Sequence, residues 1–153
     1  KGIISIFTYN FNTASQNFKN ENCKYVSLCD YNTLLPQAIE QKYIKEEDLS
    51  IALTSGDVPV LSTPRVIAWC EAATMAAIEG HISEQETTVG MRVRIDHVNP
   101  SGLGAMIRVS ALLTRIDGRR LTFQVSAHDE HSQIAMGQVI RVIVHRQRFL
   151  ERV

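Results

Sequence analysis

Three reactive side chains lie in the middle of the sequence: the hydroxyl of Thr63, the carboxyl of Glu71 and the imidazole of His97. A hydroxyl or an activated water can attack an acyl carbonyl, and a histidine can move the proton near neutral pH. Glu71 stands out because it is the only charged residue between Val66 and Ile78, a run that is otherwise apolar or small. A carboxylate in such surroundings is costly unless it is paired, and perturbed carboxyls concentrate at functional sites. We therefore treat these three residues as a candidate acyl-transfer site.

One predicted helix carries two of the three residues. Thr63 is a favoured N-cap type, and Pro64 suits the first helical position, where a missing N–H costs nothing. Gly80 is a typical residue at a helix end. Because the residues between are apolar or small on nearly every side, we expect the helix to be buried over most of its surface. Its N-terminus would offer unpaired backbone N–H groups to a developing oxyanion.

Four antiparallel strands are expected after this helix, and His97 lies near the end of the first of them. One buried helix followed by four long strands predicts an α+β hot-dog fold, in which an antiparallel sheet wraps round a central helix. A second copy pairing with the open sheet edge would protect that edge. The buried face of the first strand is expected to hold Val89, Met91, Val93 and Ile95. The strands are expected at residues 87–98, 105–116, 120–129 and 133–145, with a tight turn at Asp117-Gly118 and a bulge at Gly137.

The first 45 residues form a separate predicted part of the chain. Their alternating strand and helix patterns predict a short parallel βαβα appendage before the hot-dog fold. Two strands are too few for a stable sheet, so this segment must lean on something else. We therefore divide the chain into residues 1–45 and a hot-dog domain of residues 46–153. The expected elements are strands at 2–7 and 24–29, a helix at 12–20, and a second helix that Asp30 caps and that runs to Glu40.

Composition narrows the classes of partner and the compartment. Lys+Arg and Asp+Glu both number 16 among the 153 residues, so no net charge recruits nucleic acid or an anionic membrane. No apolar run reaches the roughly 18–20 residues of a membrane-spanning helix, and no signal peptide is visible. Cys23, Cys29 and Cys70 are odd in number and lack metal-ligand spacing. We expect free, buried thiols in a cytoplasmic protein.

Each candidate residue also has an ordinary structural explanation. Thr63 can act only as a helix cap, Glu71 as one member of a structural ion pair, and His97 as a partly exposed strand-end residue. The patterns by themselves then indicate only a hot-dog-like domain, with ligand binding as one option for its function. One hairpin turn carries three further residues of metal-binding type, although we favour a solvated loop there: His128, Asp129 and His131.

Several longer motifs surround the three residues, and together they resemble a known family. The motifs are Gly56–Pro64, Glu71–Ala73, Val89–Val93 and Asp117–Phe123, together with His97. Over about residues 48–144 the chain resembles the fluoroacetyl-CoA thioesterase-like family of hot-dog hydrolases. The family's functional threonine, helix glutamate, strand histidine, carbonyl-approaching glycine and coenzyme-side arginine fall on Thr63, Glu71, His97, Gly90 and Arg141.

This resemblance implies hydrolysis of a small acyl-CoA to free acid and CoA, with no metal and no cofactor, since the CoA is part of the substrate. It also implies a homodimer with sites at the subunit interface. The alternative is a non-catalytic hot-dog module that binds an acyl thioester or a protein partner. The basic tail of Arg146, Arg148 and Arg152 would touch CoA phosphates or be solvated, and we favour solvation.

A second resemblance covers about residues 1–49. The segments Ile6–Phe11 and Tyr25–Leu35 resemble the C-terminal end of bacterial orotate phosphoribosyltransferase. The diphosphate-binding motif of that family is absent, so we expect a remnant without phosphoribosyl transfer. The thioesterase-like family normally has a β-strand just before the stretch that corresponds to Glu46-Glu47-Asp48. Either residues 24–29 or another piece of the appendage replaces this strand, or the sheet is one strand short.

Overall fold

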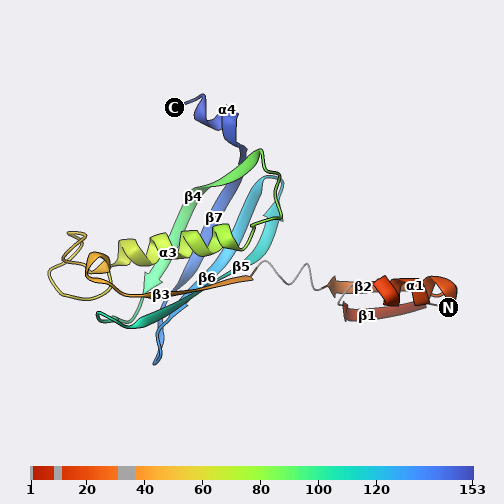
Figure 1. The fold of residues 1–153 in the computed structure, drawn as a ribbon, viewed down its shortest axis with the longest axis horizontal. Coiled ribbons are helices and arrows are strands. Elements are labelled where there is room, and N and C mark those ends of the chain that lie inside the picture. The colour runs from red at the N-terminus through yellow and green to blue at the C-terminus, as the bar shows by residue number, and fades with distance from the viewer. Residues whose placement is uncertain (1, 9–11, 31–36) are drawn as a thin grey trace. The chain divides into compact units, whose positions relative to one another are not determined.

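The computed structural model describes residues 2–8, 12–30 and 37–153. The chain divides into two compact units, Lys1–Pro36 and Gln37–Val153 (Figure 1). Each unit is considered separately below. None of the described helices is both long enough and apolar enough to cross a membrane.

The first unit has the predicted strand–helix–strand order. It comprises β1 (Gly2–Thr8), α1 (Asn12–Asn20) and β2 (Lys24–Asp30), and the two strands pair in parallel. The ring of Phe18 from α1 stacks on Tyr25 of β2 with centroids 4.5 Å apart. The Ser5 hydroxyl lies 2.8 Å from the Tyr25 hydroxyl and donates to Ser27 Oγ at 3.1 Å. These contacts tie the helix and both strands together.

The helix predicted from Asp30 to Glu40 is wrong where the structure can test it. Residues 37–43 form a strand, β3 (Gln37–Tyr43), which pairs antiparallel with β5 (Met106–Asp117). Residues 31–36 lie outside the described part of the chain. Pairing to a long strand overrides the local capping signal at Asp30, because each residue of β3 finds a partner on β5. β3 lies just before Glu46, where the family resemblance implies a strand, and the second compact unit begins at Gln37.

The second unit has the predicted hot-dog architecture. Its five strands form one antiparallel sheet in the order β3-β5-β6-β7-β4. The long helix α3 (Thr63–Ala76) lies across the inner face of the sheet and contacts all five strands (Figure 1). The remaining elements are η1 (Glu46–Asp48), β4 (Glu86–His97), β6 (Arg120–His128), β7 (Gln133–His145) and α4 (Arg146–Leu150).

The core lies between α3 and the sheet. Val66, Cys70 and Ala73 of the helix are buried against strand residues that include Phe123 and Val139. Burial raises the pKa of the Cys70 thiol to about 12, so this thiol is a core residue and not a nucleophile. Cys23 and Cys70 are both free, as predicted, but Cys70 is buried whereas Cys23 is partly exposed. The side chain of Cys29 lies outside the described part of the structure.

The helix is less enclosed than predicted. Ala68, Ala72 and Met75 lie on one exposed stripe of α3, so the apolar sequence is covered by the sheet on one side only. The helix ends at Ala76, before Gly80, which adopts a positive φ of 75° in the following turn. An exposed apolar stripe on a core helix indicates a surface that another protein surface can cover.

A β-bulge interrupts the alternation predicted for β4. Gly90 pairs with Arg141 and Arg92 with Ile140, so Met91 is an extra residue with no partner on β7. Before the bulge, Thr88 and Gly90 face the helix; after it, odd-numbered residues such as His97 do. Predicting one buried face for residues 89–95 is therefore wrong at Val89 and Met91, and Met91 is 48% exposed.

The bulge predicted at Gly137 is absent, because Gly137 pairs in continuous register with both Ile95 and Val125. A Cβ at this position would collide with the backbone of Arg94 and Ile95. Glycine is required here because two strands approach closely, and not because the strand changes register.

We expect the boundary at Gln37 to be visible in truncated chains. Residues 37–153 should keep a cooperative unfolding transition, whereas residues 46–153 lose β3 and Ile44, which is 2% exposed. Removing one buried isoleucine side chain alone costs about 2–5 kcal/mol. Urea unfolding followed by circular dichroism should therefore give a free energy of unfolding at least about 2 kcal/mol lower for the shorter chain. Equal stability of the two chains would contradict the assignment of β3 to this unit.

Candidate functional site

Thr63 and His97 meet where the start of α3 passes the end of β4. The helix cap is Ser62 and not Thr63, since the Ser62 hydroxyl accepts the Arg65 backbone N–H at 3.3 Å. Thr63 occupies the first helical position, which leaves its hydroxyl free of the capping role. Its Oγ1 lies 3.0 Å from His97 Nδ1. Because Ser62 caps the helix, the hydroxyl of Thr63 can form a hydrogen bond with the imidazole of His97.

The environment of His97 favours a neutral imidazole. Burial lowers the pKa of His97 below its usual 6.5, and a backbone hydrogen bond with Asn99 opposes this only in part. The second ring nitrogen, Nε2, is buried and has no hydrogen-bond partner among the described residues. A neutral ring with one nitrogen on a hydroxyl can accept a proton from it. Thr63 and His97 also line one cleft of about 230 Å³, together with Val60, Leu61 and Pro100.

Glu71 lies further along α3, in a different set of contacts. Its Oε1 accepts a hydrogen bond from Arg141 Nη1 at 3.3 Å. The Glu71 side chain is 37% exposed, while the Arg141 side chain is 7% exposed. Arg141 also donates to Thr88 Oγ1 at 2.8 Å and to the Thr88 carbonyl at 2.9 Å. Burial lowers the pKa of Arg141, and the charge of Glu71 opposes that effect. The ion pair therefore holds a carboxylate at the edge of solvent on a buried, fully engaged guanidinium.

Gly90 lies directly against the Glu71 carboxylate. A Cβ at this position would overlap Glu71 Oε1, so any larger residue would displace the carboxylate or be displaced by it. Gly90 also pairs with Arg141 across β4 and β7. The three residues therefore form one cluster, in which the strand backbone, the carboxylate and the guanidinium are in contact.

One chain brings the five predicted residues together in two groups. Thr63 contacts His97, and Glu71 contacts Gly90 and Arg141. Thr63 and Glu71 are eight residues apart on α3, which is about 12 Å along a helix axis. The cleft beside Thr63 and His97 is not lined by Glu71. In a single chain the three reactive side chains do not share one cavity.

Sequence reasoning missed two residues that shape this arrangement. Ser62 is an N-cap type like its neighbour Thr63, and either one fits the local pattern. Thr88 supplies two acceptors to Arg141, but its position on the inner face follows only from the bulge at Met91. The resemblance placed Arg141 near the coenzyme, whereas the structure engages its guanidinium with Thr88 and Glu71.

The hairpin that was considered as a metal site is a hydrogen-bonded turn. Asp129 accepts the backbone N–H groups of His131 and Ser132 at 2.8 and 2.7 Å, and the Ser101 hydroxyl at 2.8 Å. The backbone bond from His131 is the main cause of a lowered Asp129 pKa. Among the described residues, no group of three or more His, Cys, Asp or Glu side chains could hold a metal ion.

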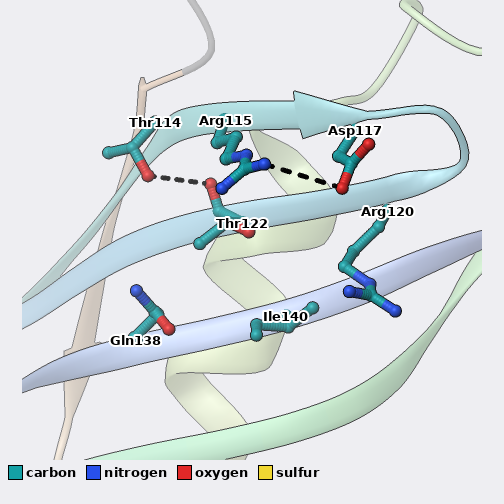
Figure 2. A pocket seen from close by; sticks show the side chains of 7 residues that line it. All are labelled: Thr114, Arg115, Asp117, Arg120, Thr122, Gln138 and Ile140. Carbon is teal, nitrogen blue, oxygen red and sulfur yellow. Dashed lines mark hydrogen bonds and ion pairs between the residues drawn. The ribbon is translucent and has the colours of Figure 1, made fainter.

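The outer face of the sheet carries a separate cavity of about 390 Å³ (Figure 2). There Thr114 donates to the Thr122 carbonyl at 3.1 Å, and Arg115 lies 3.7 Å from Asp117 in an exposed ion pair. Arg120, Gln138 and Ile140 complete its wall in the close view. None of the five predicted site residues lines this cavity, so it is not part of the candidate site.

The sheet wraps round a helix whose first hydroxyl meets a strand imidazole and which carries a carboxylate two turns further on. This is a hot-dog protein with the groups needed for acyl transfer. Residues 44–147 match the family of fluoroacetyl-CoA-specific thioesterases, FlK, and the chain belongs to that family. The fluoroacetyl-CoA thioesterase of Streptantibioticus cattleyicolor is 29% identical over 94 residues, which cover 61% of this chain and 68% of that protein.

Solved structures show the same fold. A crystal structure of a variant of the fluoroacetyl-CoA-specific thioesterase FlK aligns with a TM-score of 0.73 and 22% identity, covering 78% of this chain and 93% of that one. A structure of this variant with fluoroacetate and CoA aligns with a TM-score of 0.69 and 24% identity, covering 74% and 95%.

The first unit has a different relative. The orotate phosphoribosyltransferase of Cytophaga hutchinsonii is 40% identical over 48 residues, which are 31% of this chain but 23% of that enzyme. This identity confirms the resemblance of the N-terminal segment. The chain spans less than a quarter of the length of this relative.

The contact between Gly90 and Glu71 leads to a test by substitution. In Gly90→Ala the new methyl group must push the carboxylate away, and Glu71 can swing into solvent because it is partly exposed. We expect the rate of thioester hydrolysis, as kcat/KM, to fall at least about tenfold, which corresponds to about 1.4 kcal/mol in the barrier. The melting temperature should change little. Gly102→Ala is the matched control, because a Cβ there meets no atom within 4 Å. Equal kcat/KM in both variants would show that the position of Glu71 does not matter.

The lowered pKa of His97 predicts the direction in which activity and stability change with pH. A base must be neutral to accept a proton, so kcat/KM should be constant near pH 7 and fall on acidification, with a midpoint below 6.5. The folded state favours the neutral ring of His97. The share of the free energy of unfolding that depends on this ring is therefore complete above about pH 6.5, and it is lost as the pH falls through the lowered pKa. The measurement is a pH profile of kcat/KM, repeated on His97→Gln to assign the midpoint. A midpoint above 6.5 that depends on His97 would contradict this account.

Proposed function

We propose that this protein hydrolyses a small acyl-CoA thioester to the free acid and CoA, without a metal or a cofactor. The observation that carries the proposal is the hydrogen bond between Thr63 Oγ1 and His97 Nδ1 at the N-terminal end of α3. It occurs in a chain that belongs to a thioesterase family. A relative from that family has been crystallised with fluoroacetate and CoA. We leave the acyl group general, because the substrate named for a relative is a property of that relative.

Each group has one proposed task. His97 takes a proton from the attacking hydroxyl, that of Thr63 or of a water molecule, and returns it to the CoA sulfur as the C–S bond breaks. The backbone N–H of Gly90 and the mouth of α3 stabilise the negative charge on the carbonyl oxygen. Glu71 positions the attacking water or the acyl carbonyl, and Arg141 holds Glu71. In a route through an acyl-Thr63 ester, water then cleaves the ester and regenerates the hydroxyl.

A homodimer would unite the two groups of residues. β4 is an edge strand of the sheet, so its outer side is open to pairing with a second β4. When the extra residue Met91 is left out of the register, Gly90 and His97 each lie three positions from Arg94, which is the midpoint between them. Antiparallel pairing about that midpoint therefore places His97 of one protomer opposite Gly90 of the other. The exposed stripe of α3 would be covered in the same assembly. We propose that each site takes Thr63 and His97 from one protomer and Glu71 and Gly90 from its partner.

Mixing two inactive variants tests this shared site. Thr63→Ala and Glu71→Gln chains should each be inactive as homodimers. In heterodimers formed by co-refolding, one of the two sites regains both wild-type residues. Random mixing gives half heterodimers, so activity should return to about a quarter of the wild-type value. If all site residues came from one chain, the mixture would stay inactive.

A panel of short acyl-CoAs, assayed by release of free thiol, tests the activity itself. We expect turnover by the full chain and a loss of at least about a hundredfold in kcat for Thr63→Ala, Glu71→Gln and His97→Ala. His131→Gln and Glu130→Gln on the exposed hairpin turn are matched controls and should keep wild-type rates. Near-normal turnover in all three site variants would end the assignment.

A non-catalytic hot-dog module is the second candidate. The observation that favours it is the separation of Glu71 from the pair of Thr63 and His97 within one chain. Such a module would bind an acyl-CoA with no turnover by either the wild type or the mixed variants.

For either function we propose a reducing, cytoplasmic location, which the free thiols of Cys23 and Cys70 support.

A further inference from the structure

A basic cleft lies where α4 meets the end of β7 and the hairpin between β5 and β6. Its volume is about 150 Å³. Three guanidinium groups and one imidazole line it, together with one aromatic ring and one aliphatic side chain. The lining residues are Arg119, Val144, His145, Arg148, Phe149 and Arg152. We call this group the arginine cleft.

The charges of the arginine cleft are not balanced locally. No carboxylate lines the cleft, and none of the ion pairs found among the described residues involves Arg119, Arg148 or Arg152. Three glutamates, at positions 79, 84 and 86, line a neighbouring cavity instead. Three converging, unpaired guanidinium groups repel one another and favour a ligand with several negative charges. Arginine forms bidentate hydrogen bonds with phosphate, and an aromatic face accepts a stacked base.

The arginine cleft lies in line with the Glu71 cluster. On β7, Arg141 and His145 face the same side of the sheet, because they are four residues apart in a strand. That separation corresponds to about 13 Å. The arm of CoA that joins its sulfur to its diphosphate is comparable with about four residues of extended chain, roughly 14 Å. A thioester held at Glu71 and Gly90 would therefore place its phosphates near His145 and Arg148.

We propose that the arginine cleft binds the phosphoadenosine end of the CoA substrate. Arg119, Arg148 and Arg152 contact the phosphates, and the Phe149 ring lies against the adenine. This inference rests on the proposed function, because it takes the thioester to be held at Glu71. It replaces our sequence-based preference for a solvated tail. Arg148, Phe149 and Arg152 lie beyond residue 147, where the match to the family ends. The cleft is thus assembled largely from this chain's own C-terminal segment.

The test compares two substrates that differ in the nucleotide. Acetyl-CoA carries the phosphoadenosine end, whereas S-acetylpantetheine carries the same thioester on the same arm without it. We expect Arg119→Gln and Arg148→Gln each to raise KM for acetyl-CoA about tenfold, with kcat unchanged. Neither change should alter kcat/KM for the short thioester. Arg120→Gln is the matched control, since Arg120 adjoins Arg119 in sequence but lines the cavity on the outer face (Figure 2).

Binding of adenosine 3′,5′-bisphosphate, measured by calorimetry on the full chain, separates this inference from the proposed function. If neither thioester is hydrolysed but the bisphosphate binds and Arg148→Gln weakens it about tenfold, the proposed function fails and the arginine cleft stands. If both thioesters are hydrolysed and the arginine variants change neither KM nor bisphosphate binding, the arginine cleft is refuted and the proposed function stands. Equal kcat/KM for the two thioesters in the wild type would also refute the cleft.

Discussion

The extra residue in β4 determines which side chains can work together. Gly90 and His97 are an odd number of positions apart, so a regular strand would place them on opposite faces of the sheet. The bulge at Met91 shifts the register by one, and both residues face α3. Gly90 then meets Glu71 from the helix, and His97 meets Thr63. The arrangement of these side chains therefore depends on one extra residue in β4.

The second constraint is the buried guanidinium of Arg141. Its donors are shared between Thr88 and Glu71, so the arginine is held by the strand and in turn holds the carboxylate. Glu71 is 37% exposed and therefore partly hydrated, so its position in the pair depends mainly on the guanidinium that Thr88 fixes. This explains how a carboxylate can stay fixed at the surface of an apolar helix. In this structure Arg141 is placed to position Glu71, and its contact with the coenzyme stays a prediction.

Much of this fold follows from sequence periodicity, and the errors have identifiable causes. The four strands from residue 86 onward were predicted because apolar residues recur along them with the period of a strand. The helix was predicted because an apolar run lies between Thr63-Pro64 and Gly80. β3 was missed because a cap-like Asp30 precedes it and its pairing partner lies about 70 residues away in β5. The bulge was missed because Val89 and Met91 continue an apolar alternation that the backbone does not follow. Glu71 was found because a lone charge in an apolar helix is costly, whereas its guanidinium partner depends on long-range register.

In the shared site that we propose, one copy of this chain supplies the hydroxyl and the imidazole, and a second copy supplies the carboxylate. The most direct measurement is a crystal structure of the full chain with a non-hydrolysable ketone analogue of acetyl-CoA. The account predicts that the analogue carbonyl lies within hydrogen-bond reach of the Gly90 N–H of one protomer. Thr63 and His97 of the other protomer should face the same carbonyl. A structure that leaves these side chains in separate surroundings, with no cavity common to the two protomers, would contradict the account.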